Sequence, residues 1–247
     1  MDYLHYDIRW TDELDEEYIF DFLYVQNSVF MNGSREEFAR QFQRNIYGRS
    51  IIVVVYFEGQ PIAARALWRN DVDGREAYQA GSSCVLQQFR GLRIFTEMTS
   101  RAIAMLPDDV LVYNFPNRNS FPACSKMGWD MVRQYKFRLY LSYDSFHDEH
   151  PMPLDSRYAQ WWMEGRKLYH TRIGGHYFII KRDWRPFCYH ILAETDKSVA
   201  EKFPGRLGLF LYMSSKITWY NKRFGITRLM SVNQGESVVP TWKIDCI

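Results

Sequence analysis

The sequence predicts an α/β protein in which a mixed, twisted sheet is flanked by helices and is followed by a smaller α+β half. Runs of β-branched and aromatic residues alternate along the chain with segments whose apolar residues recur at helical spacing. Of the 247 residues, 47% are hydrophobic and 24% are charged, which is the usage of a globular protein with a substantial core. Disordered, collagen-like and coiled-coil structures are therefore excluded.

The first part of the chain predicts one strand and two helices. Residues 6–10 form a short strand, and Asp12 or Asp15 caps the amphipathic helix that follows. Ser34, with Glu37 three residues later, is the capping box of a second helix.

A meander of three strands comes next. Residues 51–57, with the sequence IIVVVYF, and residues 61–68 form a hairpin across the turn at 58–60. A second turn at 70–74 leads into a long extended segment, 75–86.

The remaining elements of this half alternate. Apolar residues on one face predict a helix over 91–106, followed by a strand at 110–115. A short helix at 121–127 ends at a glycine, and residues 131–141 form a further strand.

The C-terminal part has a weaker pattern. Residues 143–156 are polar, contain two prolines and are expected to be a linker. A second hairpin, 177–181 with 187–193, aligns with the earlier hairpin after a shift of 125 residues. This indicates either a duplicated domain or two hairpins of similar length. We expect two domains, 1–145 and 146–247.

Composition excludes several classes of protein. The net charge of +2 and the lack of a basic stretch argue against a nucleic-acid partner. The longest apolar run, 51–57, is too short to span a membrane. The first ten residues contain no apolar run typical of a secretory signal, so a cytoplasmic location is expected. No C-x-x-C pair occurs, so we expect free thiols and no metal site at Cys84, Cys124, Cys188 and Cys246.

The segment that carries chemistry is residues 85–95, which passes from a strand through a turn into an amphipathic helix. The amino terminus of a helix leaves backbone N–H groups unpaired and attracts phosphate. Gly91 allows close approach of a ligand to the backbone, and Arg90 and Arg93 add charged donors. The alternative is a helix that merely begins after a glycine.

This segment resembles the pyrophosphate loop Q/R-x-x-G-x-G/A of the GNAT superfamily of acyl-CoA-dependent N-acyltransferases, in its bacterial two-part type. The loop would be residues 88–93, and the order of elements over residues 3–141 is similar to that of the family. The position 125 residues after Gly91 is Lys216 and has no glycine loop, so a second unit in 146–247 would be a degenerate GNAT-like unit that shapes the acceptor pocket. Asn117 and the K-x-G-aromatic sequence at 126–129 resemble the second family signature.

The resemblance implies that acetyl-CoA is the acyl donor, with its pyrophosphate on the loop and its pantetheine along the preceding strand. The residues expected to bind it are Ser83, Val85, Gln88, Phe89, Arg90, Gly91, Leu92, Arg93, Ile94 and Asn117.

Two positions depart from the family pattern. Arg93 stands where a second small residue is usual, and it would either crowd the phosphates or clamp them. Cys124 stands where many members have a tyrosine that protonates the departing thiolate. A thiol with a pKa of about 8.5 leaves readily near neutral pH, so little proton assistance is needed.

The expected chemistry is direct attack of a neutral amine on the thioester, with the strand amide near Val85 stabilising the oxyanion. Glu76 is the candidate general base. The alternative is a solvated or salt-bridged carboxylate that faces away, unless a bulge resets the strand alternation. Tyr113 and Asn114 would lie by the acceptor, with one of them facing the core. Glu76, Tyr113 and Cys124 are thus the candidate catalytic residues.

We therefore expect an N-acetyltransferase that acts on a primary amine of a small molecule, for example an amino sugar. One alternative is a non-catalytic acyl-CoA-binding or scaffold protein with the same fold. Another is a peptidyl transferase that uses aminoacyl-tRNA, although tRNA contact requires a positive surface that the near-neutral charge does not supply. No metal and no membrane partner are expected, and a homodimer is one alternative for the assembly.

Overall fold

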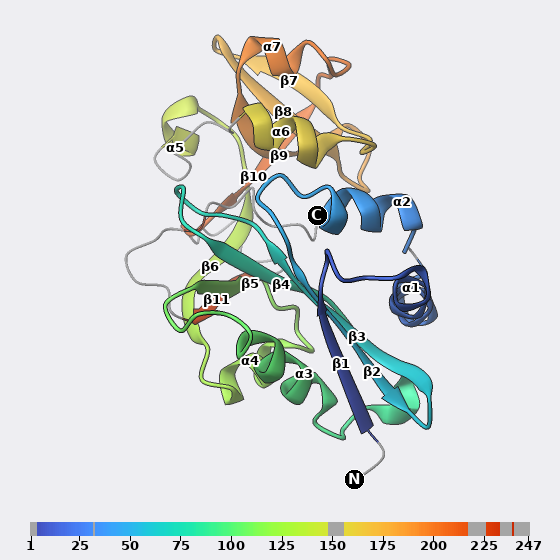
Figure 1. Ribbon diagram of the computed structural model, residues 1–247. Coiled ribbons are helices and arrows are strands. Elements are labelled where there is room, and N and C mark those ends of the chain that lie inside the picture. Colours follow the sequence, from blue (N-terminus) through green and yellow to red (C-terminus); the bar gives the residue numbers. More distant parts are fainter. Residues whose placement is uncertain (1–3, 32, 148–155, 217–225, 233–238, 240–247) are drawn as a thin grey trace. The chain divides into compact units, whose positions relative to one another are not determined.

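The computed structural model describes residues 4–31, 33–147, 156–216, 226–232 and 239 (Figure 1). The chain divides into two compact units. The first comprises Met1–Val132 with Leu229–Val238, and the second comprises Arg133–Arg228 with Val239–Ile247. The first unit therefore takes in a strand from near the end of the chain, which the consecutive domains 1–145 and 146–247 do not include. The assignment of those two ranges to domains stays a prediction.

The first unit is built on a mixed sheet. Strands β1 to β4 pair antiparallel in sequence order, β5 pairs parallel to β4, and β11 pairs antiparallel to β5. These strands are β1 (Leu4–Trp10), β2 (Ile51–Phe57), β3 (Gln60–Arg69), β4 (Ala77–Val85), β5 (Leu111–Asn114) and β11 (Thr227–Val232).

Helices cover both faces of this sheet (Figure 1). The helices are α1 (Glu16–Phe30), α2 (Arg35–Phe38), continued by a wide turn at Ala39–Gln43, α3 (Ile94–Ile103) and α4 (Phe121–Lys126). Strand alternation explains the two cores: Ile52 and Val54 pack with α1, whereas Ile51, Val53 and Val55 pack with α3. Because both faces are covered, β2 is apolar throughout.

The predicted caps of the first two helices are confirmed. Asp15 Oδ1 accepts the Tyr18 N–H of α1 at 2.8 Å, and Ser34 Oγ accepts the Glu37 N–H of α2 at 3.1 Å. Each bond satisfies an N–H group that the helix itself leaves unpaired.

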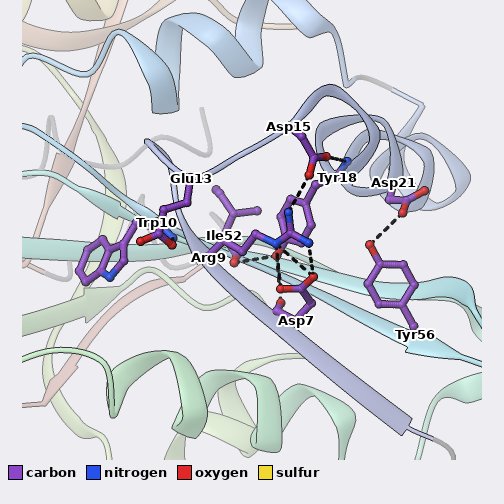
Figure 2. A network of polar contacts seen from close by, with 9 residues as sticks. All are labelled: Asp7, Arg9, Trp10, Glu13, Asp15, Tyr18, Asp21, Ile52 and Tyr56. Carbon is purple, nitrogen blue, oxygen red and sulfur yellow. Dashed lines mark hydrogen bonds and ion pairs between the residues drawn. The ribbon is translucent and has the colours of Figure 1, made fainter.

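A polar network joins α1 to the sheet (Figure 2). The Arg9 guanidinium contacts Asp7 at 2.7 Å and Asp15 at 2.8 Å, so β1 is tied to the start of the helix. The buried Tyr18 hydroxyl donates to the backbone carbonyls of Asp7 and Ile52, both at 2.9 Å. These contacts hold α1, β1 and β2 in a fixed arrangement, and α1 packs over β3 and β4.

The second unit has its own sheet. Strands β7 to β9 form an antiparallel meander, and β10 pairs parallel to β9 and antiparallel to β6. Its strands are β6 (Asp130–Leu139), β7 (Tyr169–Ile173), β8 (His176–Arg182), β9 (Cys188–Thr195) and β10 (Leu209–Ser214), and its helices are α5 (Tyr143–His147), α6 (Ser156–Met163) and α7 (Lys197–Ala200).

The topology of the second unit repeats part of the first. A three-strand antiparallel meander, a helix and a strand parallel to the last meander strand occur in both, as β2–β3–β4–α3–β5 and as β7–β8–β9–α7–β10. The shift of 125 residues instead places Ile51 of β2 on His176 of β8, one strand out of step with this correspondence. That the second unit is a degenerate GNAT-like unit stays a prediction.

The prediction of a linker at 143–156 is wrong for its first residues, because Tyr143–His147 forms α5. Phe146 explains the helix: it is buried against Phe178 and Tyr212 in the core of the second unit. An apolar anchor of this kind outweighs the polar composition of its neighbours. Residues 148–155 lie outside the described part of the chain.

Candidate active site

A β-bulge shapes the carboxyl half of β4. Ala64 of β3 pairs with Cys84 and Ala66 pairs with Gly81, so three steps along β4 oppose two along β3. Ser82 at the bulge has a left-handed φ of 47°. Gln26 of α1 donates a short hydrogen bond to the Ser82 carbonyl and so holds the bulge in place.

The bulge resets the alternation of side chains along β4. Tyr78 and Ala80 before it, and Val85 after it, all pack in the core beneath α3. Cys84 packs in the core on the α1 face. Residues 83 and 85 therefore face the same helix as residues 78 and 80, which an unbroken strand would not allow.

Strands β4 and β5 pair over a short length only. Their parallel register runs from Ala77 with Leu111 to Gln79 with Tyr113, and β5 ends one residue later, whereas β4 continues to Val85. The Leu86 N–H donates to Ile62 on β3 at 2.9 Å, so by alternation the Val85 N–H points to the opposite edge. That edge of β4 can accept an extended ligand as an added strand.

The turn after β4 presents unpaired amides. A 3₁₀ turn at Gln87–Phe89 leads through Gly91 to Arg93, which precedes α3 with a φ of 61°. The first helical bond runs from the Glu97 N–H to the Arg93 carbonyl at 3.0 Å. Within the described residues no hydrogen bond is made by the N–H groups of Gly91, Leu92 and Arg93. The helix amino terminus adds partial positive charge to these donors.

The residues at this turn fit a diphosphate. Gly91 has a φ of 85°, and a Cβ added to it would meet no protein atom within 4 Å, so the space over its backbone is open. Arg90 Nε donates to the Val85 carbonyl at 3.1 Å, which leaves Nη1 and Nη2 for a ligand. The Arg93 side chain is exposed.

The apolar members of the loop anchor it. Ile94 is buried beneath the sheet, and Phe89 packs on Phe57 with ring centroids 5.4 Å apart. Gln88 and Leu92 are exposed.

A polar cluster lies under α3 and α4. The Arg65 side chain on β3 is fully buried, and its Nη1 donates to Ser83 Oγ at 2.5 Å. The guanidinium carbon lies 4.7 Å from the centroid of the Phe95 ring. Cys124, also fully buried, receives a weak hydrogen bond from Asn114 Nδ2 at 3.8 Å. Burial raises the pKa of the Cys124 thiol, and the Arg65 charge opposes that rise.

Two of the three candidate catalytic residues are engaged within the protein. The Glu76 carboxylate lies 3.0 Å from Arg69 Nη1 and accepts the Tyr78 hydroxyl at 2.9 Å, the salt-bridged alternative for this residue. Burial, followed by the Glu76 hydrogen bond, raises the pKa of Tyr78 to about 12. Tyr113 is buried and its hydroxyl donates to the Asn70 carbonyl at 3.2 Å. Their catalytic roles stay predictions.

Alternation on β5 decides which polar residue faces α4. Tyr113 is the residue that faces the core, and Asn114 reaches Cys124 instead. Asn117 caps the turn before α4, because its Oδ1 accepts the N–H groups of Asn119 and Ser120 at 2.9 and 3.0 Å. A role of Asn117 in cofactor binding stays a prediction.

Within the described ranges there is no group of three or more His, Cys, Asp or Glu side chains placed to hold a metal ion. None of the helices in the described part has the length and apolar character needed to cross a membrane.

No family model and no curated protein matches the sequence. Solved structures do match. A GCN5-related N-acetyltransferase from Kribbella flavida superposes with a TM-score of 0.52 and 12% identity, over 91% of this chain and 71% of that chain. One from Anabaena variabilis ATCC 29413 gives 0.53 and 12%, over 91% and 72%. An Enterococcus faecalis V583 protein of unknown function, described as a probable N-acyltransferase, gives 0.57 and 11%, over 92% and 72%.

The chain has the GNAT fold. These superpositions establish the fold. Because the sequence identities are low, the activity of this chain has to be argued from its own residues. In this chain the open edge of β4 leads directly into the turn whose N–H groups at 91–93 have no hydrogen-bond partner among the described residues.

Sequence reasoning missed Arg65 and Gln26. A charged residue inside the otherwise apolar segment Ile62–Trp68 is the signal that would have singled out Arg65. No local signal marks Gln26, because its partner Ser82 is 56 residues away in the sequence.

Proposed function

We propose that the protein transfers an acyl group, with acetyl-CoA as the expected donor, to a primary amine of a small molecule. The observation that carries the proposal is the turn before α3, where the N–H groups of 91–93 have no hydrogen-bond partner among the described residues and the space over Gly91 is open. Anionic diphosphate is the ligand that such a helix terminus favours.

Chain residues would hold the donor at two places. The amides of residues 91–93, assisted by Arg90 and the exposed Arg93, would bind the diphosphate. The pantetheine amides would pair with β4 near Ser83 and Val85, on the edge that β5 leaves open.

The bound acyl-CoA supplies a thioester that a neutral amine can attack. The Val85 N–H, directed to the open edge of β4, would donate to the thioester oxygen as negative charge develops there. Of the three candidate catalytic side chains, Cys124 lies in the polar cluster with Asn114 and Arg65. A role for Glu76 as base requires release of its ion pair with Arg69.

A non-catalytic acyl-CoA-binding protein is the second candidate. It is favoured by the internal contacts of Glu76 and Tyr113, which leave neither side chain free for proton transfer in this structure. Such a protein would use the same loop to bind the donor.

Two measurements test these functions. Isothermal titration with acetyl-CoA should show saturable binding, and absence of binding at millimolar donor would refute both candidates. Release of free CoA is then followed with a thiol reagent over a panel of small primary amines. Amine-dependent release supports transfer, whereas binding without release from any amine supports the non-catalytic protein.

A further inference from the structure

Arg65 is a buried cation with unused hydrogen-bonding capacity. Its side chain is 0% exposed, and within the described residues its Nε and Nη2 atoms have no hydrogen-bond partner. Among the described residues, Nη1 donates to Ser83 Oγ. No carboxylate forms a salt bridge with it among the described residues. A polar group buried in this way ordinarily has partners for all its donors.

The charge persists despite burial. Burial lowers the pKa of Arg65 to about 10, which still leaves the guanidinium protonated near neutral pH. Ser83 Oγ and the face of the Phe95 ring offset part of the desolvation cost. The rest of the desolvation cost argues against a purely structural role for a cation that has no carboxylate partner among the described residues, since an apolar side chain of similar volume would be more stable there.

The position of Arg65 indicates which negatively charged group its guanidinium would bind. Ser83, bonded to Nη1, lies on the part of β4 where the pantetheine arm is expected to run. Cys124, close enough for the Arg65 charge to act on its thiol, stands where the family resemblance places the acid for the departing thiolate. Arg65 is therefore bonded to the strand along which the donor is expected, and its charge acts on the thiol at the position of the missing acid.

We propose that Arg65 is a catalytic residue whose guanidinium pairs with the coenzyme A sulfur as it departs, in place of the tyrosine acid. This inference rests on the proposed function. A cation that has no carboxylate partner among the described residues is suited to this task, because its full interaction forms only when the thiolate forms.

The step balances without any further reactant. The amine nitrogen forms a bond to the acyl carbon, the carbon–sulfur bond breaks, and its electron pair goes to sulfur. Arg65 keeps its proton and donates Nε–H or Nη2–H hydrogen bonds to the thiolate. The proton lost by the amine passes to a base or to water.

A spectroscopic titration of free CoA bound to the full chain tests this without knowledge of the acceptor. The ultraviolet absorbance of the thiolate is followed against pH, and the complex with desulfo-CoA is subtracted because it contains the same protein cysteines. Wild type is compared with Arg65→Met, which removes the charge, and with Arg65→Lys, which keeps it. Arg101→Gln is the matched control, since Arg101 lies exposed on α3 and pairs with Glu97.

The expected result is a bound CoA thiol in wild type with a pKa at least about one unit, or tenfold in acidity, below its ordinary value of about 8.5. Arg65→Lys should keep part of this shift, Arg101→Gln all of it and Arg65→Met none. Arg65→Met should also melt at a higher temperature than wild type, because a buried charge that has no carboxylate partner among the described residues has been removed.

A thiol that titrates at its ordinary pKa in the wild-type complex would overturn the inference, and this comparison needs no variant to fold. An equal downward shift in wild type and Arg65→Met would also overturn it. In both cases CoA binds, so the proposed function stands. Failure of wild type to bind CoA would instead remove the proposed function and the inference together.

Discussion

Substitution of Gly91 by alanine separates backbone strain from loss of ligand space. Gly91 has a φ of 85°, a conformation that costs an L-residue about 1–2 kcal/mol. The added Cβ meets no protein atom within 4 Å, so no packing is lost and no clash within the protein is created. We expect Gly91→Ala to fold, with a free energy of unfolding about 1–2 kcal/mol lower than wild type.

Gly91→Ala should also lower the affinity for acetyl-CoA, which backbone strain alone would not explain. The methyl group would occupy the face of the loop on which the diphosphate is expected, and we expect the affinity for acetyl-CoA to fall by at least about tenfold, or 1.4 kcal/mol. Urea unfolding measures the stability, and isothermal titration measures the affinity.

Gly74→Ala is the matched control. Gly74 lies in the turn between β3 and β4 with a φ of 73°, and a Cβ there also meets nothing within 4 Å. Its stability should fall by a similar amount while its acetyl-CoA affinity stays at the wild-type value. Equal affinities in Gly91→Ala and Gly74→Ala would refute the assignment of the loop.

Three further outcomes are expected. Arg93→Gly should raise the free energy of unfolding by about 1 kcal/mol, because glycine adopts the φ of 61° without strain. The same substitution should weaken CoA binding in a calorimetric titration. Unchanged affinity would show that Arg93 does not clamp the phosphates. The Arg185 guanidinium holds the pKa of Asp183 well below its ordinary range, so the carboxylate contributes stability that is present above about pH 3.9 and is lost as the pH falls further. Unfolding followed by circular dichroism should therefore show that the stability of Asp183→Asn falls less steeply with acid than that of wild type. An unchanged slope would contradict this. Burial raises the pKa of Cys84 to about 12 and also raises that of Cys124. Peptide mapping should therefore find both thiols unmodified by iodoacetamide until the chain unfolds. Rapid labelling of the native protein would contradict their burial.

Periodicity and turn residues were enough to predict the elements of the first unit. The continuous run of β-branched and aromatic residues over Ile51–Phe57 and the Glu58-Gly59 turn predict the β2–β3 hairpin, and the caps at Asp15 and Ser34 predict where α1 and α2 begin. These signals are local, so a single sequence contains them in full.

Features that depend on distant parts of the chain could not be predicted in this way. The bulge at Ser82 is fixed by Gln26 of α1, and β11 pairs with β5, which lies far from it in the sequence. The predicted helix 91–106 begins three residues late, at Ile94, because Gly91 and Arg93 both have positive φ. Backbone conformation and long-range pairing of this kind leave little trace in local composition.

The same distinction applies to the candidate site. The loop motif was visible in the sequence, whereas the engagement of Glu76 by Arg69 depends on the approach of β3 to β4. The buried environment of Arg65 likewise results from the packing of α3 and α4 on the sheet.

The central claim is that the amides before α3 bind the diphosphate of the donor. Amide chemical shifts of ¹⁵N-labelled protein, recorded with CoA and with pantetheine, which lacks the diphosphate, test it most directly. The claim predicts that the resonances of Gly91, Leu92 and Arg93 shift with CoA and remain in place with pantetheine. Binding of CoA that leaves these three resonances unmoved would contradict it.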